Sequence, residues 1–372
     1  KRLCLLSVAT GGILATSAAA QGQNYYSREK YEAVLDRRQP AYDPEPIRLG
    51  AFLVDSSLNG SATYTDNVQA TENNKISDTI VRIGADIAAR TNWNVHEIGV
   101  DVSAYRSEYI DIGDESANDL RARLRGRLDV NRNVSLGAAV FAQDIVEART
   151  DLANAVGLDA PVEYTRMGGS LEANYQSDRF RWYNSVEVTE ENFKDGQQAG
   201  TGIIIDQDYR DNTVTAGRSR LSYALSPNVA VYTQGTLRET SYDQDQLLDG
   251  ALRSRDSSGY TAAVGVDFEL NSLVRGDVNV GYLSENKDDP YFKDVDGVSV
   301  DGRVQWFPTR LTTVGFKAGR RVVDIGVFES PSALQTTYGA RIDHELRRNI
   351  ILSASADFAN YDYQEIDRSD DI

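Results

Sequence analysis

From Ile47 onward, apolar and polar side chains alternate at almost every second position, and this period of two constrains the fold more than any other feature of the sequence. Residues 119–128 show it most clearly, because arginines at every second position alternate there with leucine, alanine and glycine. On a helix of 3.6 residues per turn these arginines would spread around the circumference, whereas on a strand they share one face. The same alternation covers residues 81–90, 97–104, 134–140, 166–175, 260–270 and 298–306. The pattern predicts an all-β protein.

Alternation alone also fits a soluble β-sandwich, so the connections between strands decide between the two architectures. Short turns are expected near residues 92–94, 131–133, 177–178, 226–228, 271–272, 308–309 and 348–349. They alternate with longer, acidic loops near residues 110–117, 148–162, 194–208, 242–257, 286–297 and 326–333. Short turns at one end and long loops at the other are typical of a transmembrane barrel, as are long strands with aromatic residues near their ends. We therefore predict an antiparallel, transmembrane outer-membrane β-barrel over residues 47–372.

The number of strands suggests that the barrel is incomplete. The alternating segments between Ile47 and Tyr363 give about fifteen strands, whereas bacterial single-chain barrels have even strand numbers. The chain also ends on a loop-like stretch, Arg368–Ile372. We expect a barrel truncated at its C-terminus, with roughly eighteen strands when intact. The first strand, near residues 52–67, and the last, near residues 351–363, should then be separated by a gap or joined in a strained closure.

The beginning of the chain has the composition of a secretory signal peptide. Lys1 and Arg2 form a basic start, a mostly apolar stretch follows, and Ala18–Ala20 offer a small-residue cleavage site. We assign residues 1–20 to the signal peptide. Residues 21–46 are polar and proline-containing without a clear period, and are expected to form an extended periplasmic N-terminal segment.

Composition excludes several classes of function. Cys4 is the only cysteine and lies in the predicted signal peptide, so the mature chain has no thiol for a disulfide, a metal or a nucleophile. Without Lys1 and Arg2 the chain has 37 basic and 56 acidic residues, a net charge of -19, because the full chain has 39 basic residues. Such an acidic chain is a poor partner for nucleic acid, whose phosphates need a basic face.

Basic residues on the polar faces of the strands are the candidate functional residues. They are expected to line the lumen, where rings of charge set the selectivity of a pore. The candidates are Arg121, Arg123, Arg125, Arg127, Arg218, Arg220, Arg303, Lys317, Arg321 and Arg341. Alternatively, these side chains only neutralise lumen carboxylates, and we favour this alternative because the interiors of large barrels are polar whatever they transport. The outward, lipid-facing set should include Leu120, Leu124, Val134, Leu136, Val264, Val266 and Phe268.

Two weaker signals point to other chemistry. Three acidic groups in the long loops could bind divalent cations, but none has the spacing of a calcium-binding loop. These groups are Asp111, Asp114 and Glu115, then Asp206, Asp208 and Asp211, and finally Asp243 and Asp245. His96 and His344 are the only histidines and have no catalytic spacing to a serine or aspartate. We predict solvated loops that contact lipopolysaccharide and outer-membrane lipid, no resident metal or cofactor, and no enzymatic activity.

Seven short blocks, in order along nearly all of the mature chain, carry a family resemblance. They are residues 48–52 (RLGAF), 64–68 (YTDNV), 77–80 (SDTI), 223–227 (YALSP), 306–313 (WFPTRLTT), 343–349 (DHELRRN) and 368–371 (RSDD). Together they resemble the outer-membrane β-barrel porin family of proteobacteria, which is often linked to exopolysaccharide or capsule export. The resemblance implies that role and implies no catalytic residues, while the chain departs from the family in lacking the final strands.

Three functions follow as hypotheses. The first is a passive outer-membrane channel with a polar lumen that serves polysaccharide export together with an export machinery. The second is a general or sugar-uptake porin, which small-solute conductance would distinguish. The third is a structural or adhesive surface barrel with a plugged lumen, which would not conduct.

Overall fold

The computed structural model describes residues 32–37, 45–69, 71, 73–149, 158–271, 273–324, 332–363 and 369–371. The predicted signal peptide and most of residues 21–46 lie outside this part of the chain. No helix in the described ranges is long and apolar enough to cross a membrane.

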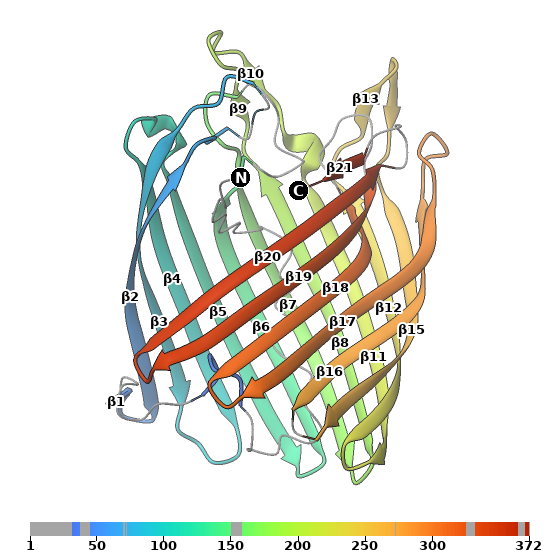
Figure 1. Cartoon of the computed structure of the whole chain (residues 1–372). Helices are drawn as coiled ribbons and strands as arrows, with labels where there is room; N and C mark the ends of the chain where they lie inside the picture. The colour runs from blue at the N-terminus through green and yellow to red at the C-terminus, as the bar shows by residue number, and fades with distance from the viewer. Residues whose placement is uncertain are drawn as a thin grey trace.

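Fifteen strands of 13 to 16 residues form one twisted, curved antiparallel sheet (Figure 1). They are β2 (Phe52–Thr65), β3 (Asp78–Thr91), β4 (Glu97–Tyr109), β5 (Ala117–Asn131), β6 (Val134–Val146), β7 (Glu163–Ser177), β8 (Phe180–Phe193), β11 (Asn212–Ser226), β12 (Val229–Tyr242), β15 (Ser257–Leu270), β16 (Val274–Lys287), β17 (Val295–Thr309), β18 (Thr312–Asp324), β19 (Ser332–Arg347) and β20 (Ile350–Tyr363). Each strand pairs with the next in this order. The predicted all-β antiparallel barrel architecture is thus confirmed, with the expected number of long strands.

The connections differ at the two ends of the barrel, as the sequence predicts. One end carries links of two to five residues, which span 92–96, 132–133, 178–179, 227–228, 271–273, 310–311 and 348–349. At the other end, at the top of Figure 1, the connections are longer and carry small elements of their own. These are the 3-10 turns η1 (Gly113–Glu115) and η2 (Asp208–Arg210) and the hairpins β9 (Gly196–Gln197) with β10 (Ile204–Ile205) and β13 (Gln246–Leu248) with β14 (Ala251–Arg253).

Strand register separates the apolar and polar side chains into two faces. Leu124 lies opposite Val100 and Val140, whereas its neighbour Arg123 lies opposite Asp101. The polar face is the concave one, because ion pairs on it skip a strand: Arg82 of β3 reaches Asp119 of β5 across β4. Side chains converge in this way only on the inside of a curved sheet. The structure therefore places the predicted lipid-facing residues on the outside of the sheet and the predicted lumen residues on the inside.

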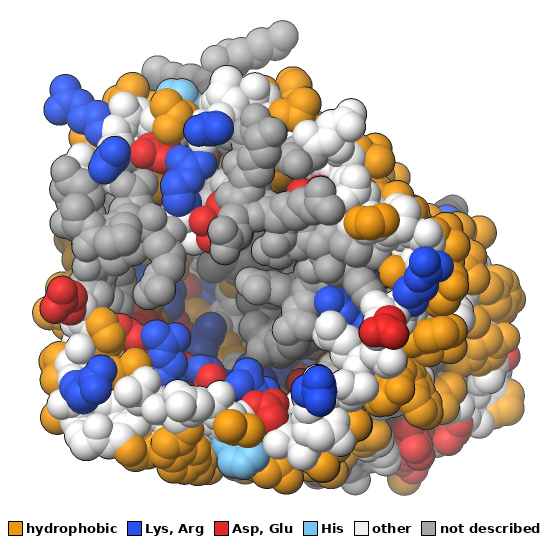
Figure 2. Space-filling model, turned by 90° about the horizontal axis from the view of Figure 1, so that it is seen from below, with side chains coloured by type: hydrophobic (Ala, Val, Ile, Leu, Met, Phe, Trp, Pro, Cys, Tyr) orange, Lys and Arg blue, Asp and Glu red, His pale blue; other side chains and the backbone are white. Residues whose placement is uncertain are grey.

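The two faces differ in composition all around the barrel. Figure 2, seen from the short-turn end, shows basic and acidic side chains bordering a hollow and hydrophobic side chains on the outer wall. Outward residues such as Leu120 and Val264 expose 52% and 62% of their surface, which suits contact with lipid. The packed core of a soluble protein is replaced here by an apolar exterior around a polar lumen.

The sheet has two edges. Among the described residues, β2 and β20 do not pair with each other, so the sheet is not closed into a ring. The short strand β1 (Ile47–Leu49) lies on the free edge of β2, and β21 (Ser369–Asp371) lies on that of β20. This agrees with the expectation that the first and last long strands are not neighbours, while the strand number of an intact barrel stays a prediction.

A turn from the N-terminal segment lies on the inner face near the short-turn end. Its described residues, 32–37, turn at 34–36, and Val34 is 1% exposed. The backbone N–H of Val34 donates to Oγ1 of Thr313 at 3.0 Å, and Arg37 pairs with Glu345 at 2.7 Å. Residues 32–37 are thus attached to the inner face of β18 and β19 near their short-turn ends. The extended form expected for residues 21–46 stays a prediction for the residues of this segment that the structure does not describe.

Candidate functional site in the barrel lumen

All ten basic residues singled out in the sequence lie on the inner face, and half of them pair with a carboxylate. Arg125 pairs with Asp101 and lies 3.5 Å from Glu97, Arg127 pairs with Asp129 at 3.2 Å, Arg220 with Asp277, Lys317 with Asp357 at 2.7 Å, and Arg341 with Asp343 at 2.9 Å. Nε of Arg321 donates to the amide oxygen of Gln335 at 3.0 Å. In these six residues the basic side chain contacts another polar group of the lumen wall, as the alternative to a selectivity role expects.

The other four make no ion pair with any described residue: Arg121, Arg123, Arg218 and Arg303. They come from β5, β11 and β17, three well-separated parts of the wall. Whether they lie at the same height along the barrel axis depends on the tilt and the register of the strands. Residues paired across neighbouring strands form a row that crosses the sheet. The row that contains Arg123 begins at Asp55, near the short-turn end of β2, and ends at Lys287, at the long-loop end of β16. Rows therefore climb toward the long loops with increasing strand number.

This climb brings Arg123, Arg218 and Arg303 to nearly the same height along the barrel axis, with Arg121 two residues, or about 5 Å, above Arg123. Arg218 is in register with Arg127, four strands away, which is a rise of about 12 Å at a tilt of about 40°. Arg127 itself lies four residues, or about 10 Å, below Arg123, so Arg218 and Arg123 are nearly level. Arg303 is in register with Ala224, four strands away, and Ala224 lies six residues below Arg218 on β11. The rise of the row and the distance along β11 nearly cancel, so Arg303 lies within about 3 Å of the height of Arg218. We call Arg121, Arg123, Arg218 and Arg303 the arginine belt.

The arginine belt does not form a wall of a single sign. Asp301 interacts electrostatically with Arg303 and Arg218, and Glu172 interacts with Arg123. Basic and acidic groups thus lie near one another on the lumen wall at these places. Such a wall can hold water and contact hydroxyl groups or ions of either sign, with the free guanidinium groups adding a local preference for anions.

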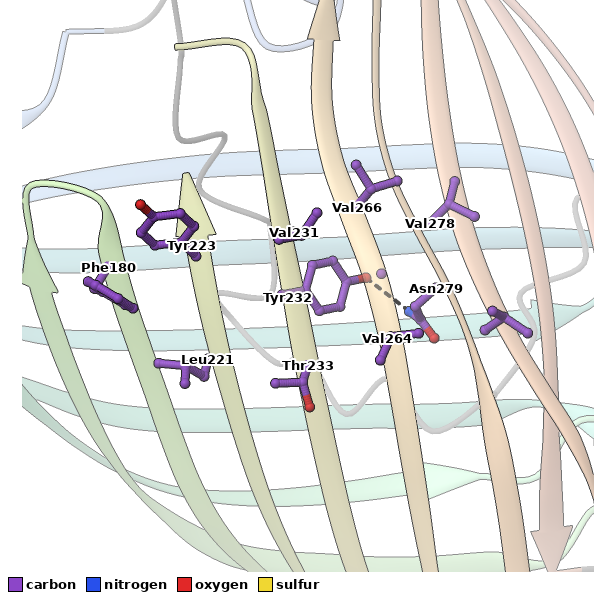
Figure 3. Close-up of a pocket in the computed structure, with 12 residues that line it drawn as sticks. Phe180, Leu221, Tyr223, Val231, Tyr232, Thr233, Val264, Val266, Val278 and Asn279 are labelled. Carbon is purple, nitrogen blue, oxygen red and sulfur yellow. Dashed lines mark hydrogen bonds between the residues drawn. The ribbon is translucent and has the colours of Figure 1, made fainter. Parts of the chain in front are cut away.

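Two rows of residues on the inner face, which the alternation pattern does not single out, have the same composition. In the Asn59 row, Asn59 of β2, Gly84 of β3 and Tyr105 of β4 are in register. In the Asn279 row, Asn279 of β16, Gly265 of β15 and Tyr232 of β12 are in register in the reverse order (Figure 3). We define each row by its three residues. Only the register reveals them, although the repeated Gly-x-Asp at 84–86 and 265–267 is a signal in the sequence.

In both rows the tyrosine ring lies over the glycine, which has no side chain in the way. A Cβ at Gly84 would lie 2.1 Å from Cδ1 of Tyr105, and one at Gly265 would lie 2.3 Å from Cζ of Tyr232. Each row thus requires glycine at its centre.

The tyrosine hydroxyls of the two rows make matching hydrogen bonds. Tyr105 donates to Asp86 and Tyr232 donates to Asp277, both at 2.6 Å. Each hydroxyl also lies within hydrogen-bond distance of the asparagine amide of its row, at 3.4 Å and 3.2 Å. An arginine covers the free face of each ring: Arg82 lies 4.7 Å from the ring centre of Tyr105, and Arg220 lies 3.4 Å from that of Tyr232. The rows hold charged groups at fixed positions on the lumen wall.

The predicted loop and histidine candidates lie at the two ends of the barrel. Carboxylate oxygens of Asp206 and Asp208 lie within 4.8 Å of one another and of Asp195, which the sequence did not single out. The third predicted member, Asp211, accepts hydrogen bonds from the backbone of Phe193 and the side chain of Asn192 instead. Burial raises the pKa of the Asp211 carboxyl, and the nearby carboxylates of Asp208 and Asp243 raise it further.

Three further candidates at the ends, Glu115, His96 and His344, have structural partners. Glu115 forms a two-pronged ion pair with Arg149. At the short-turn end, Nδ1 of His96 accepts from the backbone of Asp129, and Nδ1 of His344 lies 3.0 Å from Oγ1 of Thr312.

Comparisons with known proteins agree on the architecture. The family described as "Putative beta-barrel porin 2" matches residues 39–372. The copper transporter OprC is similar in structure, with a TM-score of 0.51 and 14% identity over 86% of this chain and 58% of OprC. The siderophore receptor PiuA from Acinetobacter baumannii is similar with a TM-score of 0.47 and 10% identity over 84% of this chain and 60% of the receptor. The chain thus spans about three fifths of the length of these barrels. No curated protein matches it.

Proposed function

Because the chain belongs to a family of β-barrel porins and resides in the cell outer membrane, we propose that it is a passive, porin-like channel serving polysaccharide export. The observation that carries the proposal is the inner wall, where carboxylates such as Asp301 and Glu172 lie near the guanidinium groups of the arginine belt. A barrel of sixteen to eighteen strands leaves an aqueous lumen.

A mixed wall suits a hydrated sugar chain. Conduction needs contacts that are favourable enough for entry and weak enough for release. Hydroxyl groups can exchange hydrogen bonds between water, guanidinium and carboxylate groups without a large change in energy. The free guanidinium groups of the arginine belt add attraction for acidic sugars. We propose lipopolysaccharide and lipid as the surroundings of the barrel, and an export machinery as its partner on the periplasmic side.

We further propose that the protein has no catalytic role. Its two histidines have structural partners at the short-turn end, and neither contacts a serine or a carboxylate through the described residues. The chemistry available in the lumen is binding and release.

Planar-bilayer recordings test the channel. We expect conductance from the wild type that falls when acidic polysaccharide fragments are added on the periplasmic side. Replacing Arg121 and Arg123 with Glu should lower the anion-to-cation permeability ratio, because neither has an ion-pair partner among the described residues. Replacing Arg127, whose charge is matched by Asp129, is the control and should change the ratio less.

Two outcomes would favour the other candidates. Conductance of small ions that polysaccharide fragments do not reduce would indicate a general or sugar-uptake porin. Absence of conductance would indicate a plugged barrel, a candidate favoured by the buried turn of residues 32–37 at the lumen end of β18 and β19.

A further inference from the structure

The lipid-facing wall carries a cluster of three hydrogen-bonding side chains on β8 and β11. On β8 and β11, Nε1 of Trp182 donates to Oγ of Ser219 at 3.0 Å, and Ser219 donates to the amide oxygen of Asn184 at 2.9 Å. These residues face outward, since they alternate with the inward Arg218 and Arg220 and pair in register with Leu221, Gly235 and Ala173. We call them the outer polar cluster.

The outer polar cluster lies where lipid offers no partner. Ser219 is the central residue of β11, at the level of the arginine belt on the other side of the wall. The amide NH2 of Asn184 has no acceptor among the described residues. Lipid tails can neither donate nor accept hydrogen bonds, so a polar group left facing them is costly. The group needs a protein partner at the same depth.

An apolar groove adjoins the cluster. Its volume is about 670 Å³, and its lining includes Leu221, Val231, Thr233 and Val264 (Figure 3). Leu221 pairs directly with Trp182, so groove and cluster are continuous on one wall. Trp182 exposes 49% of its surface beside this depression.

We propose that this wall is an interface between two copies of the chain in the membrane. Two copies with the same orientation in a bilayer are related by a two-fold axis along the membrane normal. An axis beside β11 brings β8 of one copy opposite β12 of the second copy at equal depth. Along β8, Asn184 lies two residues above Trp182, which is a rise of about 5 Å toward the long loops. Thr233 is in register with Trp182 through Leu221, two strands away, which is a rise of about 6 Å. Asn184 and Thr233 therefore lie at nearly the same depth in the membrane.

The facing groups are complementary. The NH2 of Asn184 meets the hydroxyl of Thr233 of the second copy, which is an acceptor without a partner among the described residues. By the same construction Trp182 faces Val231 of the second copy, at the groove. Each contact occurs twice, and the axis passes beside Ser219. A lipid chain could fill the groove but could not satisfy Asn184.

Crosslinking tests the interface directly. Full-length protein in native-composition vesicles, with Cys4→Ser and Ser219→Cys, is treated with a short bis-maleimide reagent. We expect a covalent dimer, because the two Ser219 positions face each other across the axis. Leu124→Cys, an outward residue on the distant strand β5, is the matched control and should stay monomeric. A monomer with Ser219→Cys as well would overturn the proposal and leave the groove to lipid.

Substitution tests the hydrogen bonds. Asn184→Leu should raise the dissociation constant of the dimer about tenfold, as expected for losing two membrane-embedded hydrogen bonds. Asn118→Leu, which changes an outward asparagine on β5, should leave it unchanged. Gel mobility of unheated samples checks that both variants fold. An unchanged dissociation constant for folded Asn184→Leu would also contradict the proposed contact.

Discussion

The Asn59 row and the Asn279 row are built from the same three residues, yet they differ in burial. In the Asn279 row, Tyr232 and Asn279 are 4% and 7% exposed, and Arg220 pairs with the same Asp277 that accepts from Tyr232. The network is closed within four neighbouring strands.

The Asn59 row lies beside the sheet edge and is more open. Asn59 belongs to β2, whose other neighbour is only the short β1. Arg82 pairs with Asp119 of β5 at 2.7 Å rather than with Asp86, which accepts from Tyr105, Asn59 and Ser57. The comparison teaches that neighbouring strands on both sides, rather than the identity of the three residues, determine how strongly a row is coupled and shielded from water.

Filling the central glycine should have the largest effect. Gly265→Ala puts a Cβ 2.3 Å from the Tyr232 ring and 2.7 Å from the carbonyl oxygen of Val278, so both ring and backbone must move. We expect a loss of about 2–3 kcal/mol in the free energy of unfolding, measured by denaturant titration in lipid vesicles.

The matched change in the open row should be milder. For Gly84→Ala we expect about 1 kcal/mol, because the three atoms nearest the new methyl group all belong to the Tyr105 ring, a side chain near the edge of the sheet. Gly235→Ala is the control, since nothing lies within 4 Å of its added Cβ. Equal losses for Gly84 and Gly265 would remove the proposed difference between the rows.

Removing the tyrosine hydroxyl should give a smaller difference in stability loss between the two rows. Tyr232→Phe leaves the partly buried Asp277 and the buried Asn279 without their shared partner, at a cost of about 1–3 kcal/mol. Tyr105→Phe should cost about 0.5–1 kcal/mol, because Asp86 keeps its bonds to Asn59 and Ser57 and water can reach it. The same unfolding titration measures both, and a larger loss for Tyr105→Phe would reverse the comparison.

Replacing the stacked arginine should have a smaller effect again. Arg220→Lys keeps the charge beside Asp277 but loses the planar contact with the Tyr232 ring, for an expected loss of about 1 kcal/mol. Arg82→Lys should cost less, since its guanidinium lies farther from Tyr105, at 4.7 Å. If both variants were as stable as wild type, the stacking would have no energetic role.

The smallest expected effect is the coupling between the rows. They lie on β2–β4 and β12–β16 and share no partner, so the double variant Tyr105→Phe, Tyr232→Phe should lose the sum of the single losses within about 0.5 kcal/mol. A larger deviation in the double-mutant cycle would mean that the two walls communicate through the lumen.

Much of the architecture could be predicted from the sequence because a barrel strand is specified locally. Alternation around Arg123 and Leu124 sets the two faces, and links such as 348–349 mark the short-turn end without knowledge of the neighbours. The expected bounds of the first and last long strands, residues 52–67 and 351–363, agree with those of β2 and β20 within two residues at every end.

What could not be predicted depends on register between strands. The sequence singled out ten basic residues, but only the paired strands show that Arg125 meets Asp101 while Arg123 keeps no ion pair among the described residues. The glycine-tyrosine rows, the grouping of Asp195 with Asp206 and the outer polar cluster likewise join residues from different strands or loops. A single sequence gives each member but not their juxtaposition.

The buried turn at residues 32–37 has a consequence for the order of assembly. Its hydrogen bond from Val34 to Thr313 joins positions 279 residues apart, and the pair of Arg37 with Glu345 spans 308. Neighbouring strands, by contrast, close short loops, which form early because little chain must be ordered. The turn can reach its place only after β18 and β19 exist, so its attachment comes late in folding, and residues 32–37 report that these two strands are in place.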